Sequence, residues 1–342
     1  MRNALAVRRI VLSLTGIVLV ALIVYSAYWH YVAGMLRDQL LPWAQARAAD
    51  GYIIHWDDAE IGGFPGSFRF DISNLSFGTL RPVPVAVNAA SVSAWAMPWN
   101  LKHWEFTTQS GARVVEPGGS AGFDMRRVDG AVDVEGRVVA AIDVTAVDLS
   151  GLGIAQGTKI GDAEAHIELP ATPPQSHTET ALGLALQLSD ATLPVAVPGF
   201  GNTLSGFSFA AQMKGALPPG QLVPALTHWR KDGGTIELQS LRLRWSSLLV
   251  DASGTLALDQ ALQPEGAFSA VITGQDAAVD VAVKTGALKP SDAGTAKAVL
   301  DLLARPNGGN GDKAITLPMT IQNQQLYLGP AKLANIPRIS WN

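Results

Sequence analysis

The sequence predicts a mostly β protein with one transmembrane helix near its N-terminus. Residues 10–32 form one long apolar segment. Residues 68–73 and 241–245 alternate between apolar and polar side chains, which is the period of a strand with one apolar face. Gly, Pro and Asp turns recur through residues 103–170 at the spacing typical of all-β proteins. We therefore expect a large, curved, antiparallel β domain after the helix, built as a groove, an open barrel or a sandwich, with a few short helices.

The apolar segment reads IVLSLTGIVLVALIVYSAYWHYV, and it contains no charged residue apart from a possible charge on His30. About 20 apolar residues are enough to cross a bilayer. Three arginines precede it: Arg2, Arg8 and Arg9. Four aromatic residues that suit a membrane interface stand at its far end: Tyr25, Tyr28, Trp29 and Tyr31. The positive flank predicts a cytoplasmic N-terminus, with most of the chain on the other side of the membrane.

A cleaved signal peptide is the competing interpretation of this segment. Its apolar region would be about 7–15 residues long and would end at a site with small residues. The segment here is longer and ends in the bulky run YWHY. An uncleaved signal anchor is favoured. It divides the chain into a tip and anchor, 1–33, and a β-rich domain, 34–342, with a possible internal boundary near residues 171–180.

Composition excludes several classes of function. The chain has 342 residues, 16% charged residues and a net charge of −4. A typical globular protein carries about 25% charged residues. This balance implies no general affinity for nucleic acid. Because the chain contains no cysteine, it has no disulfide and no thiolate metal site.

Elements other than the central strands are predicted from local signals. Residues 34–49 should form a short helix with a kink at Pro42. Residues 81–99 hold alternate prolines and should form an edge strand or a linker, not a central strand. Helices are expected at 219–234 and at 276–305, the second with Asp292 as its N-cap. The phrases DISNLSFG, DLSGLGIAQG and LSDATLPV resemble one another, and we interpret them as turns that reuse Asp, Ser and Gly.

The search for catalytic residues yields one weak candidate. Residues 118–122 read GGSAG and match G-x-S-x-G, which would make Ser120 a nucleophile. That motif needs a strand, a sharp turn and then a helix, whereas FDMRRVDGAVDVEG predicts a strand. We therefore expect no catalytic residue, no metal site and no cofactor, and we do not expect an enzyme.

Aromatic residues are the best candidates for a ligand-binding groove. Trp95 and Trp99 flank Met97 and Pro98 in a segment with poor periodicity. The other candidates come from the one-faced strands and the glycine-rich turn before them. The full set is Phe64, Phe68, Phe70, Trp95, Trp99 and Trp245.

Two regions resemble a known family of bacterial envelope proteins. The first holds Trp56, Gly63, Phe64 and Pro65 before Phe68. The second is the C-terminal third, with Leu258 and Asp259, residues 262–266, residues 328–330 and Trp341. Together they resemble the family catalogued as domain of unknown function 2125. The family pattern usually runs GFPF, whereas Gly66 and Ser67 intervene here before Phe68.

The resemblance implies a protein of the bacterial inner membrane, with a single-pass anchor and a β-rich periplasmic domain. It implies no established activity. The phrase GTLALD is also similar to the larger group of AsmA-like envelope proteins, which build long curved sheets whose apolar concave face can hold lipid chains.

These observations leave three hypotheses for function. The first is an envelope protein that binds lipid or another hydrophobic ligand on a β groove. The second is a structural or scaffolding partner of an envelope assembly complex. The third, a minor one, is a serine hydrolase that uses Ser120.

Overall fold

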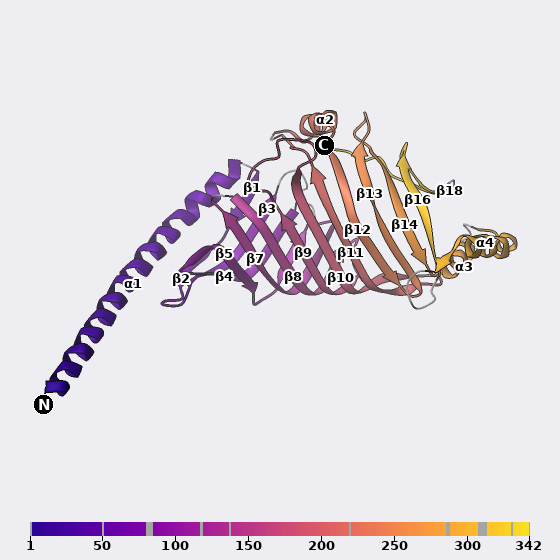
Figure 1. Ribbon diagram of the computed structural model, residues 1–342. Helices are drawn as coiled ribbons and strands as arrows, with labels where there is room; N and C mark the ends of the chain where they lie inside the picture. The colour runs from indigo at the N-terminus through magenta and orange to yellow at the C-terminus, as the bar shows by residue number, and fades with distance from the viewer. Residues whose placement is uncertain are drawn as a thin grey trace.

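The fold is a single long antiparallel sheet with an N-terminal helix attached to one edge (Figure 1). The computed structural model describes residues 2–49, 51–79, 85–116, 119–136, 138–218, 220–284, 288–306, 313–329 and 331–341. The predicted fold class, an apolar N-terminal helix followed by a large antiparallel β domain, is confirmed.

Helix α1 runs without interruption from Arg2–Ala49 and is long and apolar enough to cross a membrane. The sequence predicts a break near residue 33 and a kink at Pro42. Instead, Pro42 lies inside the continuous helix. The residues around it are mostly good helix formers such as Ala, Leu, Gln and Arg, and they maintain the helix across the proline. Apolar side chains from Leu12 to Val24 are largely exposed, as expected of a surface that faces lipid.

Within the described residues, the strands form one 18-stranded sheet in which nearly every strand pairs with the next along the chain. Short strands β1 and β2 lie end to end against β3, and β5 and β6 lie end to end between β4 and β7. The strands of the N-terminal part are β1 (Tyr52–His55), β2 (Asp58–Gly62), β3 (Phe68–Thr79), β4 (Val85–Met97), β5 (Asn100–Thr108), β6 (Ala112–Val115), β7 (Ala121–Glu135), β8 (Val138–Gly153) and β9 (Lys159–Glu168). Those of the C-terminal part are β10 (Thr180–Val197), β11 (Gly201–Lys214), β12 (Thr235–Trp245), β13 (Leu248–Leu258), β14 (Pro264–Thr273), β15 (Arg305–Pro306), β16 (Lys313–Gln322), β17 (Gln325–Leu328) and β18 (Ala331–Asn335).

The sheet is open at both edges. Within the described residues, β1 and β2 pair with β3, and β18 pairs with β17, so the first and last strands do not meet. The sheet curls so that β3, β4 and β5 lie behind the later strands in Figure 1. A curved open sheet of this kind has a concave inner face and a convex outer face.

Strand β4 corrects one prediction. Residues 81–99 were expected to form an edge strand or a linker because of their prolines. Val85–Met97 is instead a central strand, paired with β3 on one side and with β5 and β6 on the other. Pro98 follows the strand, and the other prolines of this segment fall at residues 82 and 84, outside the described residues. The strand itself contains no proline, so every residue in it can donate a hydrogen bond.

The smaller helices lie beyond the ends of the strands (Figure 1). Helix α2 (Leu222–Lys231) confirms the helix expected at 219–234. The helix expected at 276–305 is two helices, α3 (Gln275–Lys284) and α4 (Pro290–Leu303). The N-cap of α4 is Lys289, not Asp292, because Pro290 takes the first helical position and leaves Asp292 in the first turn.

The three similar phrases of the sequence each contain a bend within a strand, and the second phrase also contains the turn between β8 and β9. Asn74 in β3, Asp148 in β8 and Asp190 in β10 have positive φ angles of 50°, 52° and 53°. Asp148 of β8 and Asp190 of β10 lie on either side of Gly161, which is on the strand between them, β9. All three bends fall in strands that run in the same direction. Asn and Asp tolerate this conformation better than most residues do. The three similar phrases therefore place a line of bends across the sheet, at Asn74, Asp148 and Asp190.

The line of bends explains where the largest hydrophobic core forms. In a regular strand, side chains alternate between the two faces. Each bend shifts this alternation by one residue, so Ala146 and Leu149 of β8 point to the same face although they are three positions apart. The same spacing recurs in neighbouring strands and gathers one cluster on the inner face: Ala89, Val92, Ala112, Val128, Ala146, Leu149, Ile160 and Ala191. The bends thus allow apolar side chains of the N-terminal strands to pack against one another on the inner face.

Candidate functional site: the inner face of the sheet

An unbroken row of apolar residues crosses the inner face. Each member is the direct cross-strand neighbour of the next, from β3 to β16. We call this set the apolar row: Phe70, Ala94, Phe106, Gly130, Val144, Ala165, Leu186, Phe209, Leu241, Ala252, Ala270 and Leu317. Because neighbouring strands lie about 4.8 Å apart, the row is roughly 50 Å long.

The adjacent row on the outer face is polar over nearly the same length. It also follows direct cross-strand pairs from β3 to β16. We call this set the polar row: Asp71, Ser93, Thr107, Asp129, Thr145, Glu164, Gln187, Ser208, Arg242, Asp251, Val271 and Thr316. Only Val271 interrupts it. The contrast between the two rows assigns one face of the sheet to water and the other to apolar contacts.

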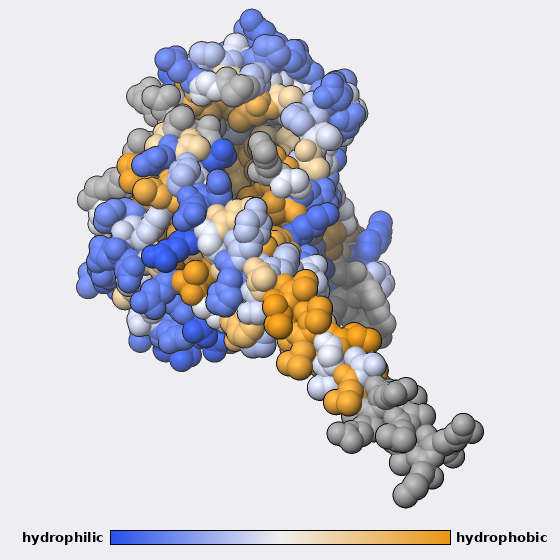
Figure 2. Space-filling model, turned by 90° about the vertical axis from the view of Figure 1, so that its left-hand side faces the viewer, coloured by the Kyte–Doolittle hydropathy of each residue, from blue (hydrophilic) through white to orange (hydrophobic). Residues whose placement is uncertain are grey.

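The apolar row is not packed like the core of a closed domain. All of its members except Phe70 and Ala270 are half-buried rather than buried. Figure 2 shows a hollow with apolar residues inside and hydrophilic residues on the flanks around it. A contiguous exposed apolar surface in a folded protein is typical of an interaction site.

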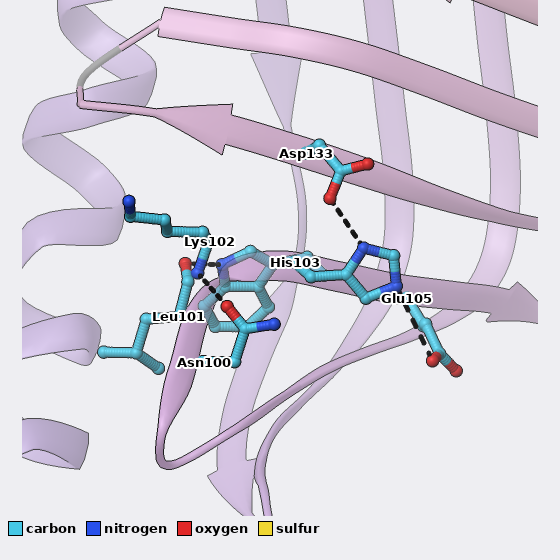
Figure 3. A network of polar contacts seen from close by, with 7 residues as sticks. Asn100, Leu101, Lys102, His103, Glu105 and Asp133 are labelled. Atoms are coloured by element: carbon cyan, nitrogen blue, oxygen red, sulfur yellow. Dashed lines mark hydrogen bonds and ion pairs between the residues drawn. The ribbon is translucent and has the colours of Figure 1, made fainter.

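Charged pairs across neighbouring strands cover the outer face. His103 Nδ1 on β5 donates to Asp133 Oδ1 on β7 at 2.7 Å, and Glu105 Oε1 lies 3.8 Å from the other ring nitrogen (Figure 3). A second pair, His166 and Asp143, repeats this geometry at 2.6 Å between β9 and β8. Since these side chains are about half exposed, their contribution is to register and solubility more than to stability.

Asp129 of the polar row is the carboxylate with the clearest electrostatic environment. The Thr107 hydroxyl donates to Asp129 Oδ1 at 2.6 Å, and this bond is the main cause that holds the pKa of Asp129 below its ordinary value. Partial burial opposes this effect and Arg127 adds to it. The folded state therefore favours the ionised carboxylate.

This lowered pKa predicts a loss of stability in acid. The Asp129 contribution is fully present above the pKa of an unfolded aspartate, about 3.9, and is lost as pH falls through the lower pKa of the folded protein. We expect Asp129→Asn to lower the free energy of unfolding at pH 6, and the difference from wild type to shrink toward pH 2. Denaturant unfolding of the full chain in detergent at several pH values measures this. A difference that does not change with pH would contradict the assignment.

Helix α1 closes one corner of the inner face. Phe68, on the same face as Phe70, is completely buried, and its ring stacks on Trp29 with a centroid distance of 5.3 Å. Trp29 Nε1 donates to the Ser67 carbonyl at 3.1 Å. A small core forms here from Trp29, Val32, Ala33, Phe68, Leu36, Ile61, Leu101 and Trp104. The ring of Trp104 in turn lies 5.9 Å from that of Phe70, so apolar contacts run from the helix into the apolar row.

The C-terminal segment packs on the turn between β13 and β14. The Gln263 side chain is almost fully buried, accepts from Ile339 N at 2.9 Å and donates to the Ile339 carbonyl at 3.1 Å. Trp341 Nε1 donates to the Leu262 carbonyl at 2.8 Å. Asp259 Oδ1 accepts from Gln263 N at 2.8 Å and orders the turn. Several of the residues that carry the family resemblance thus meet at this turn and fix the C-terminal segment to it.

The structure divides the six predicted groove residues into three groups. Phe68, Phe70 and Trp245 lie on the apolar face. Phe64 and Trp99 lie at the tips of two hairpins beside α1. Trp95 does not belong with the others, because it lies between Arg69 and Glu105 on the outer face. Its neighbours Ala94 and Ala96 point inward instead, opposite Phe70 and Phe68.

Sequence reasoning missed most of the apolar row. Phe106, Val144, Leu186 and Phe209 come from strands far apart in the chain, and only the pairing of those strands aligns them. The alternation of each strand was visible in the sequence, most clearly around Leu241. That alternation could have shown which side chains of each strand share its apolar face, but not that these side chains align in a continuous row.

Ser120 lies in the turn between β6 and β7, with no helix after it. Its hydroxyl donates to the Glu116 carboxylate, and the chain continues directly into β7. Gly118, the first glycine of the motif, lies outside the described residues. Within the part of the chain that the structure describes, no group of three or more His, Cys, Asp or Glu side chains is placed to hold a metal ion.

Comparison with known proteins gives one match. Residues 29–337 match the family described as "Uncharacterized protein conserved in bacteria (DUF2125)". No curated protein and no solved structure matches the chain. The family match begins at Trp29, the residue that joins α1 to the sheet, and extends almost to Ile339 and Trp341, which pack on the turn between β13 and β14. Because the match covers most of its length, the chain belongs to the DUF2125 family of bacterial proteins.

Proposed function

We propose that this protein is a membrane-anchored, non-enzymatic envelope protein that binds lipid chains or another long hydrophobic ligand on the inner face of its sheet. The apolar row carries this proposal. It is about 50 Å long, half-exposed and backed by a polar row, and such a surface requires an apolar partner in water. The arginines that precede the apolar segment of α1 favour a cytoplasmic N-terminus and a periplasmic sheet at the bacterial inner membrane.

The position of α1 supports a lipid rather than a soluble apolar ligand. The core around Trp29 and Phe68 connects the helix that suits a membrane to the end of the apolar row. An acyl chain that leaves the bilayer beside the helix would meet apolar side chains along the whole path. Such a path avoids exposing the chain to water, which costs about 0.8 kcal/mol for each CH₂ group.

Photo-crosslinking with a diazirine-labelled phospholipid tests the proposal. The full chain is placed in nanodiscs that contain the lipid, irradiated and mapped by peptide mass spectrometry. We expect adducts on the apolar row, for example on Phe209 and Leu241, in addition to adducts on α1. Adducts confined to α1 would mean that the helix meets lipid and the sheet does not.

A second candidate function is that of a structural partner in an envelope assembly complex. The observation that favours it is the open sheet, because β1, β2 and β18 each present an edge that pairs with no further strand in the described residues. An exposed edge can add a strand from another protein. Cross-linking in membranes should then recover specific protein neighbours through β18, and lipid adducts on the apolar row should be absent.

Catalysis by Ser120 is the third hypothesis, and we propose that it does not occur. The turn after Ser120 leads into a strand, so the motif lacks the helix that a nucleophile elbow requires. We expect no labelling of the wild-type chain by a fluorophosphonate probe, with Ser120→Ala giving the same result. Labelling of the wild type that disappears in Ser120→Ala would overturn this expectation.

A further inference from the structure

Two hairpin tips of the sheet lie against the aromatic part of α1. The Tyr25 hydroxyl donates to the Pro65 carbonyl in the turn between β2 and β3. The Tyr28 hydroxyl donates to the Pro98 carbonyl, at 2.9 Å, in the turn between β4 and β5. These bonds place both tips at the level of Tyr25 and Tyr28 along the helix axis.

The length of the helix sets the depth of this level in a bilayer. Arg9 is the last charged residue before the apolar segment, and Tyr28 is 19 positions after it. At about 1.5 Å per residue this distance is about 28 Å. The hydrocarbon core of a bilayer is about 30 Å thick. With Arg9 at one boundary of the core, Tyr28 and the two tips lie at the other boundary.

The side chains on the tips suit that depth. Trp99 is 77% exposed although it is a large apolar residue, and Phe64 and Met97 are also exposed. The two tips, residues 63–67 and 97–100, contain no charged residue. Lys102 follows on β5 with an exposed side chain, where an ammonium could meet lipid phosphate. Tryptophan at an interface and lysine just outside it are typical of contacts with a membrane surface.

We propose that the β2–β3 and β4–β5 tips enter the interface of the bilayer that α1 crosses, on the side where the sheet lies. The occupant of this apolar surface is then lipid, because the surface continues the lipid-facing side of α1 without a gap. The inference rests on the proposed membrane anchor. It adds that the sheet is held at a fixed height and tilt, with Phe68 and the start of the apolar row at the bilayer surface.

Spin labels in the full chain test the inference, and the absence of cysteine allows single sites to be chosen freely. Trp99→Cys reports on the β4–β5 tip and, being highly exposed, leaves the fold intact. Asn100→Cys is a second site on the same tip. Ile154→Cys is the matched control, since Ile154 is 84% exposed. Across the sheet, Asp143 of β8 aligns with Trp95 of β4, and Ile154 is 11 residues after Asp143. Ile154 therefore lies about 36 Å from the level of Trp95, in the direction away from the β4–β5 tip. Val18→Cys reports on the anchor itself.

Collision rates with oxygen and with a water-soluble nickel complex are measured in nanodiscs of phosphatidylcholine and phosphatidylglycerol. We expect labels at 18, 99 and 100 to collide readily with oxygen, and their nickel collision rates to fall several-fold below that of the label at 154. A label at 99 that collides with nickel as often as the label at 154 would overturn the inference and leave the anchor standing. Low rates with both reagents would indicate a protein partner at the tips and would also overturn it. Frequent nickel collisions at 18 would overturn the anchor and the inference together.

Discussion

Trp29→Ala should loosen the attachment of α1 to the sheet by about 3–5 kcal/mol, the usual cost of truncating a buried tryptophan. The indole ring is only 5% exposed, stacks on the buried ring of Phe68 and donates to the Ser67 carbonyl. The substitution removes the stacking and leaves a cavity between helix and sheet. It also leaves the Ser67 carbonyl without this donor, which adds to the cost.

Hydrogen exchange of β3 in nanodiscs measures this loss. A loss of 3–5 kcal/mol corresponds to about 100- to 4,000-fold faster exchange wherever the helix protects the strand. Trp43→Ala is the matched control, because Trp43 lies on the same helix but is 53% exposed. We expect it to change exchange by less than about 0.5 kcal/mol. Equal effects of the two substitutions would show that Trp29 does not hold the helix to the sheet.

Phe209→Glu should abolish lipid adducts on the apolar row while the adducts on α1 persist. Phe209 is half-buried in the middle of the apolar row, between Leu186 and Leu241. A carboxylate there has no partner for hydrogen bonding once an acyl chain covers it, and desolvation of such a charge costs several kcal/mol. We therefore expect lipid adducts at this level of the row to fall at least about tenfold, which corresponds to about 1.4 kcal/mol.

Ser208→Glu is the matched control for this prediction. Ser208 is the preceding residue of β11, lies in the polar row and faces Arg242 across the strands, so a glutamate there is solvated and near a cation. We expect normal adducts on the apolar row. Ala252→Trp, which fills the inner face without adding a charge, should reduce them as Phe209→Glu does. Adducts unchanged in both inner-face variants would place the lipid elsewhere.

The local pattern of the sequence is enough to predict most elements of the fold. Leu241, Leu243 and Trp245 alternate with arginines, and β12 places the two sets on opposite faces as that pattern requires. The helix at 219–234 follows in the same way from its spacing and from Gly233, which has a φ of 82° just after the helix. These features depend on residues close together in the chain, so the sequence displays them directly.

Trp95 shows why the site could not be predicted as well. By its size it should face an apolar groove, yet its strand pairs with Phe68 and Phe70, whose rings already occupy the inner side. The small residues Ala94 and Ala96 therefore take the inward positions. Which face a tryptophan occupies depends here on the volume of side chains in a neighbouring strand, and that pairing is not visible in the segment around Trp95 itself.

The aromatic residues before residue 32 show a second limit. The sequence pattern predicts a membrane belt from them, whereas Trp29 is buried against the sheet. The structure adds that Trp29 and Tyr28 also bind the two hairpin tips. A belt and a docking site require the same residue types, so composition alone does not separate them. Gly66 and Ser67, the departure from the usual family turn, provide the carbonyl of Ser67 to which Trp29 donates.

The sequence by itself determined the apolar N-terminal helix, the one-faced strands and the polar character of their other face, since each follows from periodicity within a single segment. Only the tertiary structure decided the apolar row, the line of bends at Asn74, Asp148 and Asp190, and the docking of α1 on Phe68. The physical reason is that register, curvature and docking depend on contacts between residues distant in the chain. Those contacts exist only when the strands have paired.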